Sequence, residues 1–303
     1  MNRMNRPGDK MFKGIFAPIP TPFDERGEIE WNALSDNLTW WGQTSLQGLV
    51  VAGTNGEAVL LDHEEKVKAF YFVRENLPSE KVVIAGTGCE SAKATVSLNN
   101  AAAGSGVNAV LVLNPSYYKS SMKDELLIDY YHHIAECSPL PVILYNMPRN
   151  TNVNLNAKLV VKLSKHPNIV GIKDSSGNIA QIGEIIKNSD NSFSVFAGSA
   201  DFLLPALLLG ANGGTLALAN VMPEECSNIY RLHKEGNLKK ATNEQLNILE
   251  INNAVTARYG VAGLKAAMEL IGLYGGPPRL PLAPLGSEEK QQLKETMHQC
   301  RLL

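Results

Sequence analysis

The sequence predicts a (β/α)8 barrel (TIM barrel) of the α/β class, followed by a helical extension at the C-terminus. Eight short apolar runs recur along residues 13–222, and stretches with apolar residues at helical spacing separate them. Runs that are apolar throughout are typical of strands buried on both faces of a parallel sheet. Eight strand–helix units of roughly 20 to 35 residues match this barrel better than the alternative, a doubly wound open sheet.

The expected strands occupy eight segments: 13–18, 48–52, 81–85, 109–113, 141–145, 169–173, 194–197 and 214–218. Helical spacing of apolar residues predicts helices over 31–44, 63–76, 93–103, 123–136 and 157–165. Asp62 and Ser91 stand just ahead of two of these helical segments, and both are residue types that cap helix N-termini. We therefore expect these two helices to begin directly after their caps.

The chain is expected to divide into three parts. Residues 1–12 carry charge but no long apolar run with a small-residue cleavage site, so we expect a disordered segment there. The barrel, which is the expected catalytic domain, covers 13–222. Residues 223–303 show a helical pattern with no further strand, interrupted by Gly-Gly-Pro-Pro at 275–278 and resuming at Ser287.

The composition argues against several kinds of partner. The net charge is −2 and no run of Lys and Arg occurs, so a nucleic-acid partner is not expected. No stretch of about 18 apolar residues predicts a membrane span. Four widely spaced cysteines form no Cys-x-x-Cys pair, which favours a reduced, cytoplasmic protein over a zinc ribbon or a disulfide scaffold. They are Cys89, Cys137, Cys226 and Cys300.

The sequence also lacks cofactor and metal signatures. Gly86-Thr87-Gly88 has no third glycine to complete a dinucleotide fingerprint, and no GxxxxGK[ST] phosphate loop occurs. Of the six histidines only His132 and His133 are adjacent, and neighbours on a helix point to different sides of its axis. We therefore expect neither a cofactor nor a metal ion.

The active site is expected at the carboxyl ends of the barrel strands, where the following loops converge. Glycines in these loops let the backbone come close to a small ligand, and free N–H groups at helix starts suit a carboxylate. These glycines are Gly53, Gly56, Gly86, Gly88 and Gly198. Several tyrosines and hydroxyls follow the same strands, so polar side chains are predicted at this end of the barrel, its mouth.

Lys173 ends the apolar run 168–172, and two interpretations of it are open. A lysine at the end of a strand is often simply the first solvated residue. Alternatively, a pocket removes it from water and makes a neutral amine available as a nucleophile toward carbonyls. The mouth holds one lysine together with tyrosines and hydroxyls, and this set of side chains suits covalent catalysis through an imine.

Five motifs occur in order along the chain: Pro20-Thr21-Pro22-Phe23, Gly53-Thr54-Asn55-Gly56-Glu57, Tyr145-Asn146-Met147-Pro148, Gly171-Ile172-Lys173-Asp174-Ser175 and Ala219-Asn220-Val221. In these motifs the sequence resembles, from about Gly14 to Pro281, the dihydrodipicolinate synthase and N-acetylneuraminate lyase family of Schiff-base aldolases. The resemblance favours the nucleophilic interpretation of Lys173.

The resemblance implies chemistry on small 2-oxo acids and aldehydes, without a cofactor. Lys173 would form a covalent imine with C2 of the 2-oxo acid, and Tyr145 would donate and accept protons. Thr54 would link Tyr145 to Tyr118, which crosses from a neighbouring subunit of a homotetramer, a dimer of dimers. Asn55 would hold the carboxylate of the 2-oxo acid. The other substrate-binding residues would be Asn150, Ser175, Gly198 and Thr215.

One departure from the family pattern bears on the substrate. Synthases that accept aspartate semialdehyde usually show Tyr-Asn-x-Pro-x-Arg-Thr, whose arginine binds the carboxylate of the second substrate. Here Arg149 stands one place earlier and Asn150 takes that position, as in 4-hydroxy-2-oxoglutarate aldolase. We therefore expect an aldolase that yields pyruvate and glyoxylate. The alternatives are dihydrodipicolinate synthase, a 2-keto-3-deoxy-acid aldolase or dehydratase, and a catalytically silent binding barrel.

Overall fold

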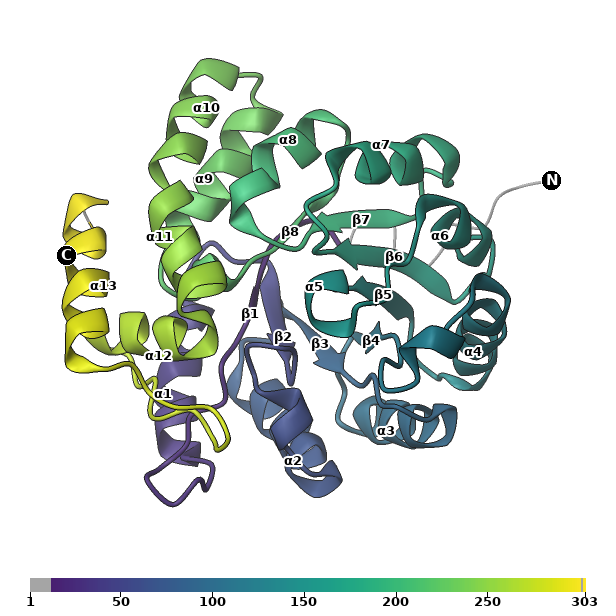
Figure 1. Cartoon of the computed structure of the whole chain (residues 1–303), viewed down its shortest axis with the longest axis horizontal. Helices are drawn as coiled ribbons and strands as arrows, with labels where there is room; N and C mark the ends of the chain where they lie inside the picture. Colours follow the sequence, from purple (N-terminus) through teal and green to yellow (C-terminus); the bar gives the residue numbers. More distant parts are fainter. Residues whose placement is uncertain (1–11, 301) are drawn as a thin grey trace.

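The computed structural model describes residues 12–300 and 302–303. Its centre is a closed barrel of eight parallel strands, hydrogen-bonded in chain order, with β8 returning to β1 (Figure 1). The strands are β1 (Gly14–Pro18), β2 (Gly48–Val51), β3 (Val82–Gly86), β4 (Ala109–Leu113), β5 (Val142–Asn146), β6 (Ile169–Asp174), β7 (Ser194–Ala197) and β8 (Gly213–Thr215). The predicted (β/α)8 barrel is confirmed, and the open-sheet alternative is wrong.

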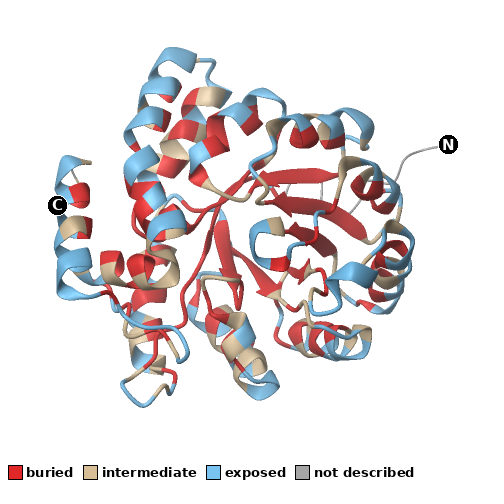
Figure 2. Ribbon diagram, viewed as in Figure 1, coloured by how far each residue is buried: buried red, intermediate tan, exposed pale blue. Residues whose placement is uncertain are grey.

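Helices surround the barrel, with their inner faces buried and their outer faces exposed, while the strands are buried except at the last residues of β3 and β4 (Figure 2). They are α1 (Trp31–Gly42), α2 (His63–Asn76), α3 (Ala92–Gly104), α4 (Asp124–Cys137), α6 (Ala157–Leu163), α7 (Ile179–Asn188) and α8 (Leu203–Leu208), with the single turn α5 (Pro148–Thr151) after β5. Asp62 and Ser91 accept hydrogen bonds from the Glu65 and Ala94 N–H groups. Both predicted caps are confirmed.

The C-terminal part begins with a helix that belongs to the ring. Helix α9 (Pro223–Lys234) packs against β1 and α8, so the ring of helices continues past residue 222, where the sequence predicted its end. The extension then consists of α10 (Leu238–Asn247), α11 (Leu249–Asn253), a π-helical turn (Ala254–Arg258), α12 (Gly260–Leu270) and α13 (Ser287–Gln299), gathered on one side of the barrel (Figure 1). The predicted break at 275–278 and the helix start at Ser287 are confirmed.

Two predicted boundaries at the ends of the barrel are wrong. The predicted disordered segment 1–12 reaches Phe12, yet Phe12 is only 1% exposed, because it packs inside the barrel near the start of β7. Residues 1–11 lie outside the described residues. The last strand ends at Thr215 rather than at residue 218, and Ala217–Asn220 form a 3-10 turn. A short apolar run does not by itself distinguish a strand from a buried turn of helix.

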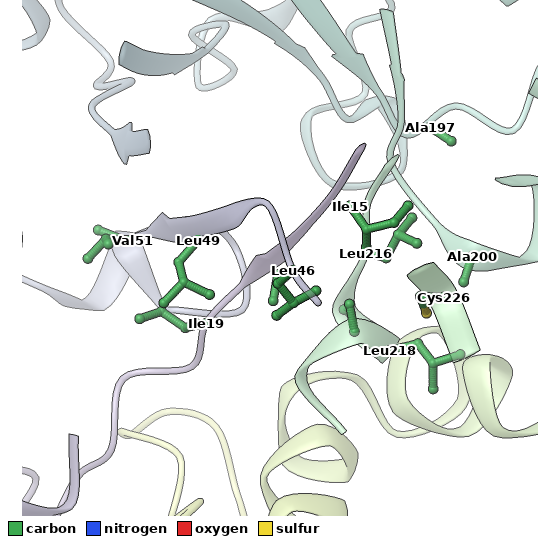
Figure 3. Packing of buried hydrophobic residues seen from close by; sticks show 14 of the residues in the cluster. Ile15, Ile19, Leu46, Leu49, Val51, Ala197, Ala200, Leu216, Leu218 and Cys226 are labelled. Atoms are coloured by element: carbon green, nitrogen blue, oxygen red, sulfur yellow. The ribbon is translucent and has the colours of Figure 1, made fainter. Parts of the chain in front are cut away.

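Apolar side chains pack together inside the barrel. The inner cluster consists of Phe12, Phe16, Val50, Val82, Ile84, Ala109, Leu111, Ile143, Tyr145, Val170 and Phe196. Alternate residues of the same strands face outward into a second core beneath the helices, and Figure 3 shows Ile15, Leu49, Leu216 and Cys226 in that layer. The loops at the carboxyl ends therefore rest on a packed floor, of which Tyr145 is a part.

Candidate active site

Lys173 and Tyr145 are neighbours at the carboxyl ends of β6 and β5. They are register partners in the parallel ladder, and Lys173 Nζ lies 4.2 Å from the centre of the Tyr145 ring. Each residue is only 4% exposed. Within the described residues no carboxylate forms an ion pair with Lys173. Lys173 is therefore not a solvated strand end, and its amine faces an aromatic ring instead of a counter-ion.

The Tyr145 hydroxyl lies 3.0 Å from the hydroxyl of Thr54, and either oxygen can be the donor in this hydrogen bond. Thr54 belongs to the loop after β2, so the contact joins two separate strand ends above the packed floor. A phenol that is hydrogen-bonded to a second hydroxyl can pass a proton without moving far. The pair is thus a short proton path beside Lys173.

A cavity of about 420 Å³ opens above these side chains, within the range of small-molecule sites. Seven of the nine predicted site residues line it: Thr54, Asn55, Tyr145, Asn150, Lys173, Ser175 and Gly198. Sequence reasoning did not assign Ser199, Asp201 or Thr256 to the site, although all three line the same cavity. Thr256 comes from the C-terminal extension, whose place over the barrel no local pattern reveals.

The residue after the lysine anchors the end of β6. Asp174 is fully buried, and its carboxylate accepts hydrogen bonds from Asn146 Nδ2 and Gln181 Nε2, at 3.1 and 2.9 Å, and from the Ser176 N–H at 2.8 Å. Successive residues of a strand point to opposite faces, so Asp174 faces away from the cavity when Lys173 faces it. The network fixes the backbone that presents Lys173.

Ser175 and Gly198 fit closely against each other beside Lys173. A side chain at residue 198 would place its Cβ 1.9 Å from the Ser175 Oγ, so only glycine fits there. The Ser175 Oγ is buried and has no hydrogen-bond partner among the residues that the structure describes. It is thus available to a bound ligand. Asn55, by contrast, donates from Nδ2 to the Pro18 carbonyl at 3.3 Å.

The structure does not bring Tyr118 or Thr215 to this cavity. Thr215 is buried in β8, opposite Phe16 of β1. Tyr118 is 71% exposed, and its ring packs edge-on against that of Tyr117, with 5.1 Å between the centroids. The Glu90 carboxylate holds the start of this loop by accepting the Tyr117 N–H at 3.0 Å. Two large rings therefore project from the surface of a single chain.

A second cavity, of about 530 Å³, adjoins the first and lies toward the tyrosine loop. Thr54, Tyr145 and Asn150 line both cavities, and Ser116, next to Tyr117, lines the second. Cys89 also lines it, and burial raises the pKa of the Cys89 thiol. Because a thiolate is the reactive form of cysteine, Cys89 is not an activated nucleophile here.

The far wall of the first cavity includes Arg149 and the π-helical turn. Arg149 Nη2 donates to the Ala257 carbonyl at 3.1 Å, and Val255, Thr256 and Ala257 line the cavity with it. Single π-helical turns often occur at functional sites. The hydrogen bond to Ala257 of the extension therefore holds the Arg149 guanidinium at the rim of the cavity.

Among the described residues no cluster of three or more His, Cys, Asp or Glu side chains is arranged to hold a metal ion. None of the helices in the described residues has both the length and the hydropathy of a membrane span.

Comparisons with known proteins agree with this geometry. Residues 11–300 match the family described as the dihydrodipicolinate synthetase family. A 4-hydroxy-tetrahydrodipicolinate synthase from Methanothrix thermoacetophila is 33% identical, over 95% of this chain and 96% of its own length. A probable mitochondrial 4-hydroxy-2-oxoglutarate aldolase from Emericella nidulans is 34% identical, over 96% of this chain and 94% of its own length.

A solved structure shows the same fold. The dihydrodipicolinate synthase of Bacillus anthracis superposes with a TM-score of 0.91 at 32% identity, over 95% of this chain and 98% of its own. Enzymes of this family are class I lyases and aldolases that bind small substrates through a lysine Schiff base, without a metal or cofactor. A barrel with a buried lysine at its mouth, matched along nearly its whole length, thus belongs to the dihydrodipicolinate synthetase family of Schiff-base enzymes.

Proposed function

We propose that Lys173 is the Schiff-base lysine and that the chain cleaves 4-hydroxy-2-oxoglutarate to pyruvate and glyoxylate. The observation that carries the proposal is the buried Lys173 amine beside the Tyr145–Thr54 hydroxyl pair. Imine chemistry requires a nucleophilic amine and a group that both donates and accepts protons, and these side chains supply both.

The reaction begins when the Lys173 amine adds to the C2 carbonyl, and loss of water leaves a protonated imine. Tyr145 accepts the proton of the C4 hydroxyl, the C3–C4 bond breaks, and its electron pair moves into the imine. Glyoxylate leaves and an enamine remains. The enamine takes a proton at C3, and water then hydrolyses the imine to give pyruvate and free Lys173. Thr54 hydrogen-bonds to Tyr145 and steers its proton throughout.

The substrate carboxylates have several neutral donors in the cavity. Ser175 offers to the carboxylate next to the imine a hydroxyl that no other group in the described part of the chain binds, and Asn55 and Gly198 line the cavity beside it. Asn150 lines the cavity where the second carboxylate would lie, and Arg149 is hydrogen-bonded to Ala257. A neutral amide in place of an arginine fork supports the smaller glyoxylate as the aldehyde product.

Dihydrodipicolinate synthase is the second candidate. The relative from Methanothrix bears that name and the one from Emericella bears the aldolase name, at similar identity, so the names do not choose between the activities. Arg149 lines the cavity, and a rotation of its side chain away from Ala257 would supply the cation that a synthase uses. A 2-keto-3-deoxy-acid aldolase or dehydratase would use the same imine.

We further propose a homotetramer, a dimer of dimers, in which Tyr118 of one subunit completes the relay of another. The exposure of Tyr117 and Tyr118 and the second cavity beside Thr54 support this arrangement. All four cysteines are free thiols, which supports a reducing, cytoplasmic location.

Trapping with borohydride tests the imine. Incubation with pyruvate and borohydride should add a reduced three-carbon group to Lys173 and inactivate the enzyme, because reduction makes the C–N bond permanent. Peptide mass spectrometry locates the adduct, and Lys173→Ala is the control. An adduct on another lysine, or none, would refute the mechanism. A panel of pyruvate with glyoxylate or aspartate semialdehyde, assayed in both directions, then identifies the aldehyde.

A further inference from the structure

A buried ion pair connects the loop of Thr54 and Asn55 to the C-terminal extension. Lys265 Nζ of α12 lies 2.6 Å from Glu57 Oε1, and the two side chains are 1% and 0% exposed. Lys265 also donates to the Pro277 carbonyl at 2.9 Å, and the second Glu57 oxygen accepts the Arg279 N–H at 2.8 Å. Both ends of the pair thus contact other protein groups in a region that is shielded from solvent.

The backbone at Glu57 is in a conformation that a glutamate seldom adopts. Its φ is +57°, in the left-handed region that favours glycine. The Glu57 N–H donates to the Thr54 carbonyl at 3.1 Å, and the Ala58 N–H donates to the Gly53 carbonyl at 3.2 Å. These bonds close the turn that presents Thr54 to Tyr145. Because a glycine would fit this backbone with less strain, the side chain is the reason for a glutamate here.

A second ion pair joins the same part of the extension to α2. The Arg279 guanidinium donates to both Glu65 oxygens, at 2.8 and 2.6 Å, and the Glu65 side chain is 23% exposed. Both Lys265 Nζ and the Arg279 guanidinium lie over the ring of Phe23, at 4.5 and 4.3 Å from its centre. The Arg279 side chain donates to Gly27, Leu60 and Glu65, and only its backbone N–H donates to Glu57. Glu65→Gln therefore removes this ion pair without changing a bond to the 53–57 turn, and it serves as a control.

Stability alone does not account for the buried pair. Removing two charges from water costs free energy that their attraction barely offsets, and apolar residues of similar volume are often as stabilising. Burial lowers the pKa of Lys265, and the nearby Glu57 carboxylate opposes that shift. Unlike an apolar contact, an ion pair defines the direction and the distance between its two groups. Here it defines how α12 and the 53–57 turn lie relative to each other.

We infer that Glu57 and Lys265 are positioning residues that set the height of Thr54 and Asn55 above Lys173. The extension is then a structural part of the active site, because α12 fixes the turn that carries the relay hydroxyl and the carboxylate-binding amide. The inference rests on the proposed function for the roles of Thr54 and Asn55. It concerns residues that do not line the cavity themselves.

The test compares the double variant Glu57→Gln/Lys265→Met with each single variant and with Glu65→Gln. The readout is the pyruvate concentration that gives half-maximal borohydride reduction of Lys173, measured beside the thermal midpoint. Both single variants leave one buried charge without its partner, so their stability should fall. The double variant removes both charges, and its stability should recover.

In the double variant, half-maximal trapping should still require at least about tenfold more pyruvate than in the wild type. Glu65→Gln should match the wild type in trapping whatever it does to stability. A stable double variant that traps pyruvate at the wild-type concentration would overturn the inference, because the pair would then be merely structural. Absence of a Lys173 adduct in the wild type would instead refute the proposed function, so the two failures are distinguishable.

Discussion

Arg149 donates a hydrogen bond from Nη2 to the carbonyl oxygen of Ala257, 3.1 Å away, and so joins α5 to the π-helical turn of the extension. The next residue, Asn150, lines both cavities beside Tyr145. The Arg149 guanidinium is therefore hydrogen-bonded at the rim of the cavity, while the neutral amide of Asn150 takes the position that an arginine has in the synthases of the family. This arrangement is what the aldolase hypothesis requires, and it defines a test at two adjacent residues.

Arg149→Ala should change kcat/KM for 4-hydroxy-2-oxoglutarate by less than about threefold, since its guanidinium is already bound to a backbone carbonyl. Asn150→Arg should improve the use of aspartate semialdehyde at the expense of glyoxylate, because an arginine fork binds a carboxylate through two hydrogen bonds. Steady-state kinetics with both aldehydes measure this change in preference.

The opposite result at Arg149 would favour the synthase. If Arg149 leaves Ala257 when substrate binds, Arg149→Ala should cost about 2 to 5 kcal/mol of carboxylate recognition. Efficient condensation of pyruvate with aspartate semialdehyde by the unmodified protein, with no turnover of 4-hydroxy-2-oxoglutarate, would refute the aldolase hypothesis outright.

Tyr145→Phe should lower turnover by roughly 10²- to 10⁴-fold, the usual contribution of a positioned acid–base group, while the fold stays stable. Tyr131→Phe is the matched control, because Tyr131 is also buried and its hydroxyl donates to the Val112 carbonyl outside the two cavities. Loss of the Tyr131 hydroxyl should lower the free energy of unfolding by about 1 kcal/mol and leave turnover unchanged. Turnover and thermal midpoints of both variants separate the two roles, and equal effects on turnover would argue against Tyr145 as the proton carrier.

The sequence was sufficient for the barrel and for the residue at the centre of the site. Apolar runs located all eight strands, although the last one ends three residues earlier than predicted. Because parallel strands end at one rim, the end of β6 predicted that Lys173 lies at the mouth of the barrel. Alternation along a strand then explains why Asp174 faces the opposite way. The expectation for Thr215 placed it at the mouth as well, but β8 is only three residues long, and Thr215 pairs with Phe16 inside the ladder.

Contacts between segments that are far apart in the chain could not be predicted from local sequence patterns. Glu57 ends one of the five motifs, but nothing in that motif points to Lys265, and only the packing of α12 against the loop after β2 brings the two residues together. The same holds for Thr256 in the cavity wall. The burial of Phe12 was missed because the charged residues around it in the sequence suggested disorder, although its ring packs among the apolar side chains inside the barrel.

Acid should weaken the fold partly through Glu65. The Arg279 guanidinium beside Glu65 lowers the pKa of that carboxyl below its ordinary value of 4.5. The unfolded chain therefore binds this proton more readily than the folded protein does, so the stabilisation is complete above pH 4.5 and is lost as the pH falls through the lowered pKa.

The thermal midpoint of the wild type should accordingly fall more steeply below pH 4.5 than that of Glu65→Gln, which has no proton to gain at that position. Glu235→Gln, in the exposed pair with Arg231, should leave the slope unchanged, because exposed pairs contribute little. Parallel slopes for the wild type and Glu65→Gln would show that this pair does not contribute to acid sensitivity.

Tyr118 should act in the active site of a neighbouring subunit, and subunit mixing tests this directly. Lys173→Ala and Tyr118→Ala are each expected to be inactive alone. In a mixed dimer, the site with an intact Lys173 receives its tyrosine from the partner that carries Lys173→Ala, so that site is complete. With random pairing of equal amounts, about a quarter of all sites should recover, since half of the dimers are mixed and each has one complete site. If Tyr118 serves its own chain, no site recovers, because each subunit lacks one of the two groups.

Co-expression with different affinity tags isolates the mixed species. The exposed position of Tyr118 in a single chain is the reason to expect recovery. An inactive mixed dimer, or a monomer in sedimentation with full activity, would exclude a shared site.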